Sequence, residues 1–209
     1  MLFRSEVVKK IVDAGYEASF FQIDVQHPEE CRALIEDTIK KYGKLDILVN
    51  NAGIAKAASM EELDLELWDA TYNTNIRSYF VLTQAALPYL LKSPYGNIIF
   101  TSSMAAIKPF DQQFSYGSTK AAVSHFTRML AISYAPKGLR VNAIAPGVID
   151  TEILANAPDG YIDAIVQGIP MRRLGTTEDI AKLAVFLASD DSSYITGQVI
   201  AACGGSSIV

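Results

Sequence analysis

The chain has 209 residues, of which 50% are hydrophobic and 20% are charged, and its formal net charge is −5. A chain of this length and apolar content can bury a sizeable core, so we expect one domain over residues 1–209 and exclude a disordered chain. The acidic balance argues against a nucleic-acid partner, and no apolar run reaches the roughly 18 residues that a membrane helix needs. The 2 cysteines, Cys31 and Cys203, lie far apart in sequence and cannot build a disulfide framework or a four-ligand zinc site. We therefore expect a cytoplasmic protein that binds no metal.

Hydrophobic periodicity and helix-terminal residues predict helices over 5–14, 28–43, most of 61–92, 115–136 and 177–189. Short apolar runs predict strands over 18–25, 45–49, 97–101, 140–145 and 198–202. Because strands and helices alternate, the predicted fold class is α/β, with a doubly wound parallel sheet. Ligands of such sheets bind at the carboxyl ends of the strands.

Small, polar and glycine residues follow four of the predicted strands. These segments are Asp24–Val25, Asn50–Gly53, Thr101–Ser103 and Pro146–Thr151. Such residues also serve as ordinary turns and caps, and for any one loop that explanation is as good as a ligand site. Four such loops at one edge of a sheet favour a binding site, where Gly53 and Gly147 would allow close backbone approach to a ligand.

The catalytic candidates are Tyr116 and Lys120, which lie one turn apart on the same face of a predicted helix. A phenol exchanges protons poorly at neutral pH unless a nearby cation favours the phenolate, and Lys120 is placed to do this. Ser103, at a predicted strand end, could direct its hydroxyl to the same point, and Asn75 adds a polar side chain in mid-helix. The alternatives are a solvent-facing Tyr–Lys pair and an asparagine that bends or caps its helix.

As a set, these motifs resemble the short-chain dehydrogenase/reductase family. The resemblance rests on NNAG at 50–53, Ser103, Tyr116-x-x-x-Lys120 and PGVIDT at 146–151, with WDATYNTNI at 68–76 and the C-terminal segment in support. It points to the compact single-domain branch, which is similar to 3-oxoacyl-carrier-protein reductases and glucose dehydrogenases. It implies a Rossmann-like oxidoreductase that transfers a hydride between NAD or NADP and a carbonyl or hydroxyl substrate. A homo-oligomer, a dimer or a tetramer, is also implied.

The resemblance also implies a role for each site residue. Tyr116 would be the general acid/base, Lys120 would lower the pKa of Tyr116 and hold the nicotinamide ribose, Ser103 would bind the substrate oxygen, and Asn75 would hold a water in a proton relay. The cofactor-binding residues implied are Asp24, Val25, Asn51, Ala52, Gly53, Tyr116, Lys120, Pro146, Gly147, Ile149 and Thr151.

The chain departs from the family pattern at its N-terminal side. None of its 13 glycines forms the Gly-rich turn that holds a dinucleotide pyrophosphate. We therefore expect a sheet that lacks the first strand, the Gly-rich turn, the first helix and the second strand, so the sequence leaves NAD or NADP open. Residues 1–5 are expected to be non-native, because 2–5 (LFRS) match the translation of a common sequencing adapter. The alternatives are an inactive fragment or pseudo-enzyme and a purely partner-binding protein.

Overall fold

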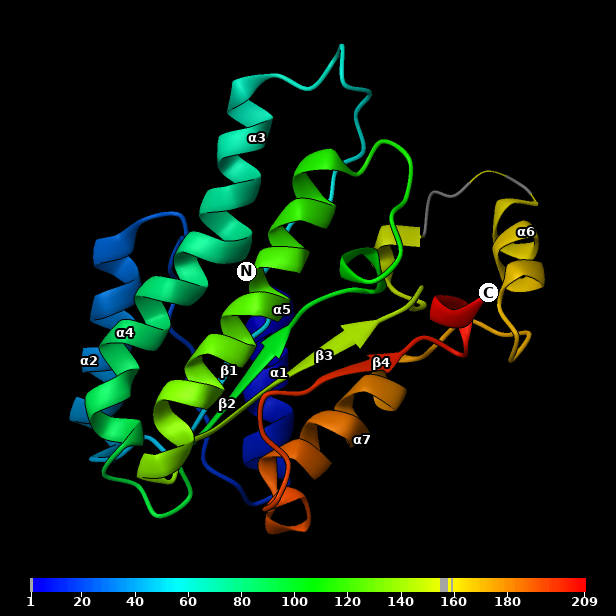
Figure 1. The fold of residues 1–209 in the computed structure, drawn as a ribbon. Coiled ribbons are helices and arrows are strands. Elements are labelled where there is room, and N and C mark those ends of the chain that lie inside the picture. Colours follow the sequence, from blue (N-terminus) through cyan, green and yellow to red (C-terminus); the bar gives the residue numbers. More distant parts are fainter. Residues whose placement is uncertain (1, 155–157, 159) are drawn as a thin grey trace.

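The computed structural model describes residues 2–154, 158 and 160–209. At its centre is a parallel sheet of four strands in the order β1-β2-β3-β4 (Figure 1). The strands are β1 (Ile47–Asn50), β2 (Asn97–Thr101), β3 (Arg140–Pro146) and β4 (Val199–Ala202). Four of the predicted strands and the α/β class are therefore confirmed, because short runs of branched apolar residues do form the centre of this sheet.

Helices cover both faces of the sheet (Figure 1). On one face lie α4 (Ser78–Leu90) and α5 (Phe114–Tyr134), with α2 (Pro28–Tyr42) packed beside α4, while α7 (Thr177–Ala188) covers the other face. Thr176 begins α7 with a reciprocal capping box to Asp179, and Gly43 ends α2 in the left-handed conformation. These helices confirm the predicted ones to within a few residues.

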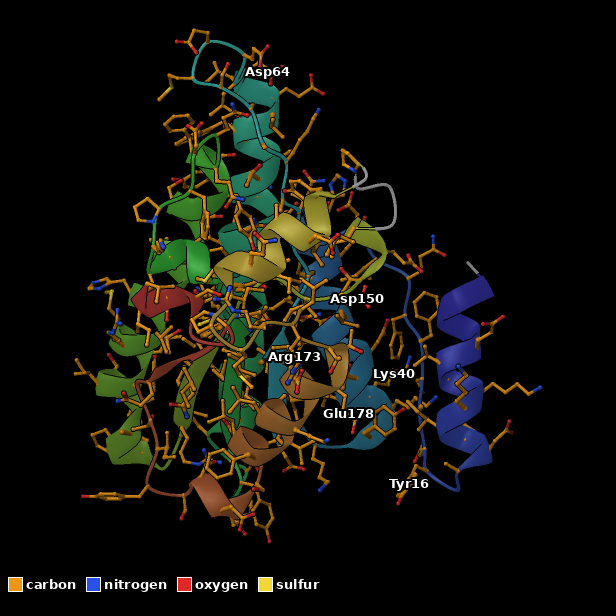
Figure 2. All side chains as sticks on the ribbon, turned by 90° about the vertical axis from the view of Figure 1, so that its right-hand side faces the viewer. Tyr16, Lys40, Asp64, Asp150, Arg173 and Glu178 are labelled. Atoms are coloured by element: carbon orange, nitrogen blue, oxygen red, sulfur yellow. The ribbon has the colours of Figure 1, made fainter. Side chains whose placement is uncertain are left out.

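The predicted helix over 61–92 is interrupted in the structure. It consists of α3 (Leu65–Tyr72), a π-helical turn over Asn73–Arg77, and α4. Asp64 begins α3 by accepting a hydrogen bond from the backbone N–H of Leu67 at 2.7 Å, and Figure 2 shows it at the far tip of the molecule. A π-helical turn inserts one extra residue into a helix and is frequent at functional sites.

The predicted strand over 18–25 is wrong, because residues 16–24 form neither strand nor helix. A strand is held by hydrogen bonds to a neighbouring strand, and no strand of the described sheet pairs with this segment. Ser19 Oγ instead lies 2.5 Å from the hydroxyl of Tyr42, at the end of α2, and Val25 packs against the core. The apolar character of the segment is thus used for packing and not for pairing.

Helix α1 (Leu2–Asp13) lies outermost, and the chain beyond Tyr16 runs between it and the rest of the molecule (Figure 2). Its apolar residues Val7, Ile11 and Val12 are all exposed. A further helix, α6 (Tyr161–Gly168), was not predicted from the sequence. None of the helices in the described ranges is both long and apolar enough to cross a membrane.

The core is divided by the sheet, because successive side chains of a strand point to opposite faces. Ile98, Phe100 and Val141 face α4 and α5 and are fully buried. Ile99 and Ile144 face α7, where they pack with Leu187. Both faces therefore hold β2 and β3 firmly, and the carboxyl ends of these two strands carry several of the candidate site residues.

Candidate active site at the carboxyl edge of the sheet

Tyr116 and Ser103 approach each other at the carboxyl end of β2. Ser103 follows β2 and caps a short 3-10 turn, where its Oγ accepts a hydrogen bond from the backbone N–H of Ala105 at 3.1 Å. Tyr116 lies in the first turns of α5, where burial raises the pKa of its phenol and a hydrogen bond with the Ser103 side chain acts in the opposite direction. The net direction is upward, so Tyr116 is held as a neutral phenol, which can donate a proton.

Lys120 lies one turn further along α5 and is buried. Its Nζ donates a hydrogen bond to the backbone carbonyl of Thr101 at 2.8 Å and lies 5.7 Å from the centroid of the Tyr116 ring. Burial lowers the pKa of Lys120 to about 8, since the charged form is poorly solvated there. The predicted i, i+4 pair is therefore not a solvent-facing one.

Asn75 lies in the π-helical turn and is fully buried. Its Oδ1 accepts a hydrogen bond from the N–H of Ile54, and its Nδ2 donates to the carbonyl of Ile54, both at 2.9 Å. Nδ2 also donates to Thr119 Oγ1 at 3.2 Å. Asn75 thus fixes the loop that follows β1 against α5, which is a more specific task than bending or capping a helix.

Gly53 lies where Asn75 and Lys120 converge. A methyl group placed on Gly53 would lie 3.4 Å from Asn75 Oδ1 and 3.5 Å from Lys120 Nζ. These are ordinary contact distances, so a side chain would fit, but it would fill the space beside the lysine nitrogen. The glycine therefore keeps the approach to Lys120 open.

A groove of about 650 Å³ runs from this edge of the sheet along the face that α7 covers. Asn51 and Thr101 line it, and Thr101 Oγ1 donates a hydrogen bond to Asn51 Oδ1 at 2.8 Å. Further predicted cofactor-binding residues that line the same groove are Pro146, Gly147, Ile149 and Thr151. Five of the predicted cofactor-binding residues thus share one open groove, and Thr101 is an addition to them.

The close approach at Gly147 is to another part of the chain. A methyl group on Gly147 would lie 2.8 Å from Cα of Cys203, at the end of β4. This glycine therefore lets the segments after β3 and β4 pass each other, and the contact that demands it in this structure is not one with a ligand.

Two predicted cofactor-binding residues lie apart from this groove. Asp24 Oδ1 accepts a hydrogen bond from the N–H of Gln26, and Val25 packs into the core beside α2. Neither lines the groove or bonds to the catalytic candidates among the described residues. Ala52 is exposed between Asn51 and Gly53.

Several residues of the site were missed by sequence reasoning. Thr119 holds Asn75, and Ser102 Oγ donates to the backbone carbonyl of Lys120 at 3.0 Å. Tyr79 is fully buried, with its ring centroid 5.6 Å from Lys120 Nζ. The available signal for Tyr79 was its spacing, because it lies four residues after Asn75 and so one turn along the same helix face.

Comparisons with known proteins agree with this geometry. Residues 3–207 match the family described as enoyl-(acyl carrier protein) reductase. The 3-oxoacyl-[acyl-carrier-protein] reductase of Thermotoga maritima is 38% identical over 185 residues, which are 88% of this chain and 75% of that protein. A subunit of (2S)-[(R)-hydroxy(phenyl)methyl]succinyl-CoA dehydrogenase, BbsD of Thauera aromatica, is 36% identical over 98% of this chain and 84% of that protein.

Solved structures are also similar. ElxO with NADP bound superposes with a TM-score of 0.85 at 39% identity, over 90% of this chain and 77% of that one. The aldohexose dehydrogenase of Thermoplasma acidophilum superposes with a TM-score of 0.88 at 30% identity, over 97% of this chain and 89% of that one. On the matched family, these identities and the shared fold, the chain belongs to the short-chain dehydrogenase/reductase family of NAD(P)-dependent oxidoreductases.

Proposed function

We propose that this chain reduces a small carbonyl substrate to an alcohol, with Tyr116 as the proton donor. The observation that carries the proposal is the contact of Tyr116 with Ser103 beside a buried Lys120. Burial favours the neutral phenol of Tyr116, which is the form that a reductase needs before the proton moves. The relatives named for 3-oxoacyl reduction support a 3-oxoacyl thioester as the first substrate class to examine.

Ser103 would bind the substrate oxygen and stabilise the negative charge that develops on it. The backbone N–H of Ala105 already occupies one acceptor position of Ser103 Oγ, so the hydroxyl proton stays available for a second oxygen. Tyr116 would then donate its proton to that oxygen. Both hydroxyls would then act on the same oxygen, which is the arrangement that general acid catalysis requires; their mutual hydrogen bond supports this role.

Lys120 and Asn75 would support the proton transfer by Tyr116 without touching the substrate oxygen. The ammonium of Lys120 uses one donor on the carbonyl of Thr101, which leaves two N–H groups for other acceptors. A cation at this position would favour the phenolate after Tyr116 has lost its proton. Asn75, through Ile54, would keep the loop over Lys120 in place.

The described residues fit the nicotinamide end of an NAD(P) cofactor. Gly53 leaves open the space beside Lys120 Nζ, whose free N–H groups suit the hydroxyls of a ribose. Thr101, Ile149 and Thr151 would line the groove beside the ring. When bound, the nicotinamide supplies the hydride. Asp24 and Val25 stay a prediction for contact with the adenine.

The test is an assay in which absorbance measures the consumption of NADPH or NADH, with a short 3-oxoacyl thioester as substrate. We expect Tyr116→Phe to lower the rate by about 10²- to 10⁴-fold, the range that general acid catalysis supplies. Ser118→Ala is the matched control, because Ser118 lies on α5 beside Tyr116 and bonds to the carbonyls of Phe114 and Ser115. Equal rates for Tyr116→Phe and the unchanged chain would overturn the assignment.

A second candidate is a chain that keeps the catalytic side chains without holding a dinucleotide. It is favoured by the sequence, since the glycines within these 209 residues stand singly apart from Gly204 and Gly205. A titration with NADPH, in which the fluorescence of the cofactor reports binding, distinguishes the two candidates. Micromolar binding would favour the reductase, whereas no binding at millimolar cofactor would favour the second candidate.

We also infer a homo-oligomer for this chain. Helix α5 exposes Met129 and Ile132 on its outer face, where Ile132 is 80% exposed. These two side chains lie three residues apart on one helix, where a second copy of the chain would cover them. Light scattering of the purified chain would test this inference, and a monomeric mass at all concentrations would contradict it.

A further inference from the structure

Tyr79 is a buried phenol that the proposed reaction does not use. It lies in α4, one turn after Asn75, with no exposed surface, and its ring stacks on Phe100 at 5.7 Å between centroids. Its hydroxyl has no hydrogen-bond partner among the described residues. Burial is the main cause that raises the pKa of Tyr79 well above its ordinary value, and the nearby Tyr116 adds to it. The phenol of Tyr79 is therefore neutral.

Lys120 lies against two aromatic rings that come from different helices. Its Nζ is 5.6 Å from the centroid of Tyr79 in α4 and 5.7 Å from the centroid of Tyr116 in α5. Both distances fall within the roughly 6 Å at which an ammonium is attracted to the face of an aromatic ring. The attraction is strongest where water is excluded, and Lys120 is almost fully buried.

The other groups around Lys120 are not anionic. Thr101 contributes a backbone carbonyl from β2, Gly53 lies nearby in the loop after β1, and Asn75 adds a neutral amide from the π-helical turn. No ion pair of the described residues includes Lys120, and burial is the cause that lowers its pKa. The Thr101 carbonyl and the two rings are therefore the groups here that favour the charged form.

We propose that Tyr79 is a positioning residue whose ring stabilises the ammonium form of Lys120 and holds its Nζ beside Tyr116. The ring acts through its π face, and the hydroxyl is not needed. A link to catalysis rests on the proposed function, because it requires that Tyr116 be the acid. The effect of Tyr79 on the ionisation of Lys120 does not depend on the role of Tyr116, and it can be measured without substrate.

The test is a pH titration of Lys120 by NMR, in chain labelled at lysine Cε and Nζ, with Lys120→Arg used only to assign the resonance. Tyr79→Phe keeps the ring and removes the hydroxyl. Pentafluorophenylalanine in place of Tyr79 keeps the shape of the ring but reverses the sign of the electrostatic potential over its face. We expect the pKa of Lys120 to be unchanged in Tyr79→Phe and to fall by about one unit with the fluorinated ring. Near-isosteric replacement avoids a cavity, so both chains should fold.

The matched control is pentafluorophenylalanine in place of Phe126, which packs on Phe100 at 5.8 Å and is not one of the two rings described above beside Lys120 Nζ. An equal shift in this control, or a shift in Tyr79→Phe as large as that with the fluorinated ring, would overturn the proposal. An unchanged pKa in all variants would also overturn it. If the pKa moves as expected but the chain reduces no carbonyl, the proposed function fails while the role of Tyr79 stands.

Discussion

On the face covered by α4 and α5, Ile98, Phe100 and Val141 have no exposed surface, whereas on the opposite face of the same sheet Val49 is 51% exposed. The covered face supplies the supports of the catalytic candidates, because Asn75, Tyr79 and Lys120 all lie within it. The open face forms the groove along β1 and α7. Ile99 and Ile144 on that opposite face are buried against α7, so its open space lies beside β1. Rigid packing and open space thus adjoin each other, as a reaction that needs fixed side chains and an accessible ligand would require.

The largest expected effect comes from the covered face. Phe100→Ala removes a fully buried ring that contacts Tyr79 and Phe126, so we expect the free energy of unfolding to fall by about 3–5 kcal/mol. Urea denaturation followed by circular dichroism measures this change. A loss below about 1 kcal/mol, small for such a cavity, would show that this face is packed more loosely than the structure indicates.

Gly147→Ala tests the close contact between Gly147 and Cys203 at the rim of the groove. The added methyl would lie 2.8 Å from Cys203 Cα, a backbone atom, so the ends of β3 and β4 must separate. We expect a loss of about 1–3 kcal/mol in unfolding free energy, the usual cost of overpacking. Gly168→Ala is the control, since nothing lies within 4 Å of its added methyl, and it should be close to neutral. Equal effects of the two changes would contradict a tight contact at Gly147.

The burial of Lys120 predicts a pH dependence of stability. Its pKa is about 8 in the folded chain and near 10.5 when free, so between these values the unfolded chain binds a proton that the folded chain does not. Stability therefore rises with pH in this window, relative to Lys120→Met. From pH 7 to 9.5 we expect the difference in unfolding free energy to change by about 2 kcal/mol. A difference that stays constant would show that Lys120 is solvated in the folded state.

The smallest effect is expected on the open face. Val49→Thr places a hydroxyl on an exposed position of β1, where it can contact water, so the unfolding free energy should change by less than about 0.5 kcal/mol. Val141→Thr is the matched change on the covered face, and there a buried hydroxyl should cost about 1–3 kcal/mol. If the two substitutions cost the same, the contrast between the faces does not hold in solution.

The sequence predicted those parts of the fold that depend on local pattern. The apolar runs at 97–101 and 140–145 became strands because partners lie on both sides of them. The equally apolar run at 18–25 did not, since pairing depends on a neighbour and not on composition. Helix α6 was missed although its sequence is amphipathic, because it has only 8 residues and is preceded by Gly160, which has a φ of 75° and offers no side-chain cap.

For the site, motif spacing identified Ser103, Tyr116 and Lys120, which the fold brings together. It did not reveal that Asn75 binds the backbone of Ile54, because that contact joins positions 21 residues apart in the chain. Tyr79 was overlooked because a tyrosine in an apolar helix has the pattern of an ordinary core residue. Only the structure shows which buried ring is next to the lysine.

The π-helical turn at Asn73–Arg77 joins α3 to α4 and carries Asn75. A π-helical turn accommodates one residue more than an α-helical turn while the helices on either side keep nearly the same rotation about the axis. The buried side of α4 therefore stays on the core, as it would in a continuous helix, although the chain carries an additional residue at this point. The local widening is where Asn75 bonds to the backbone of Ile54, so the turn places an amide at the site without any change in how the flanking helices pack.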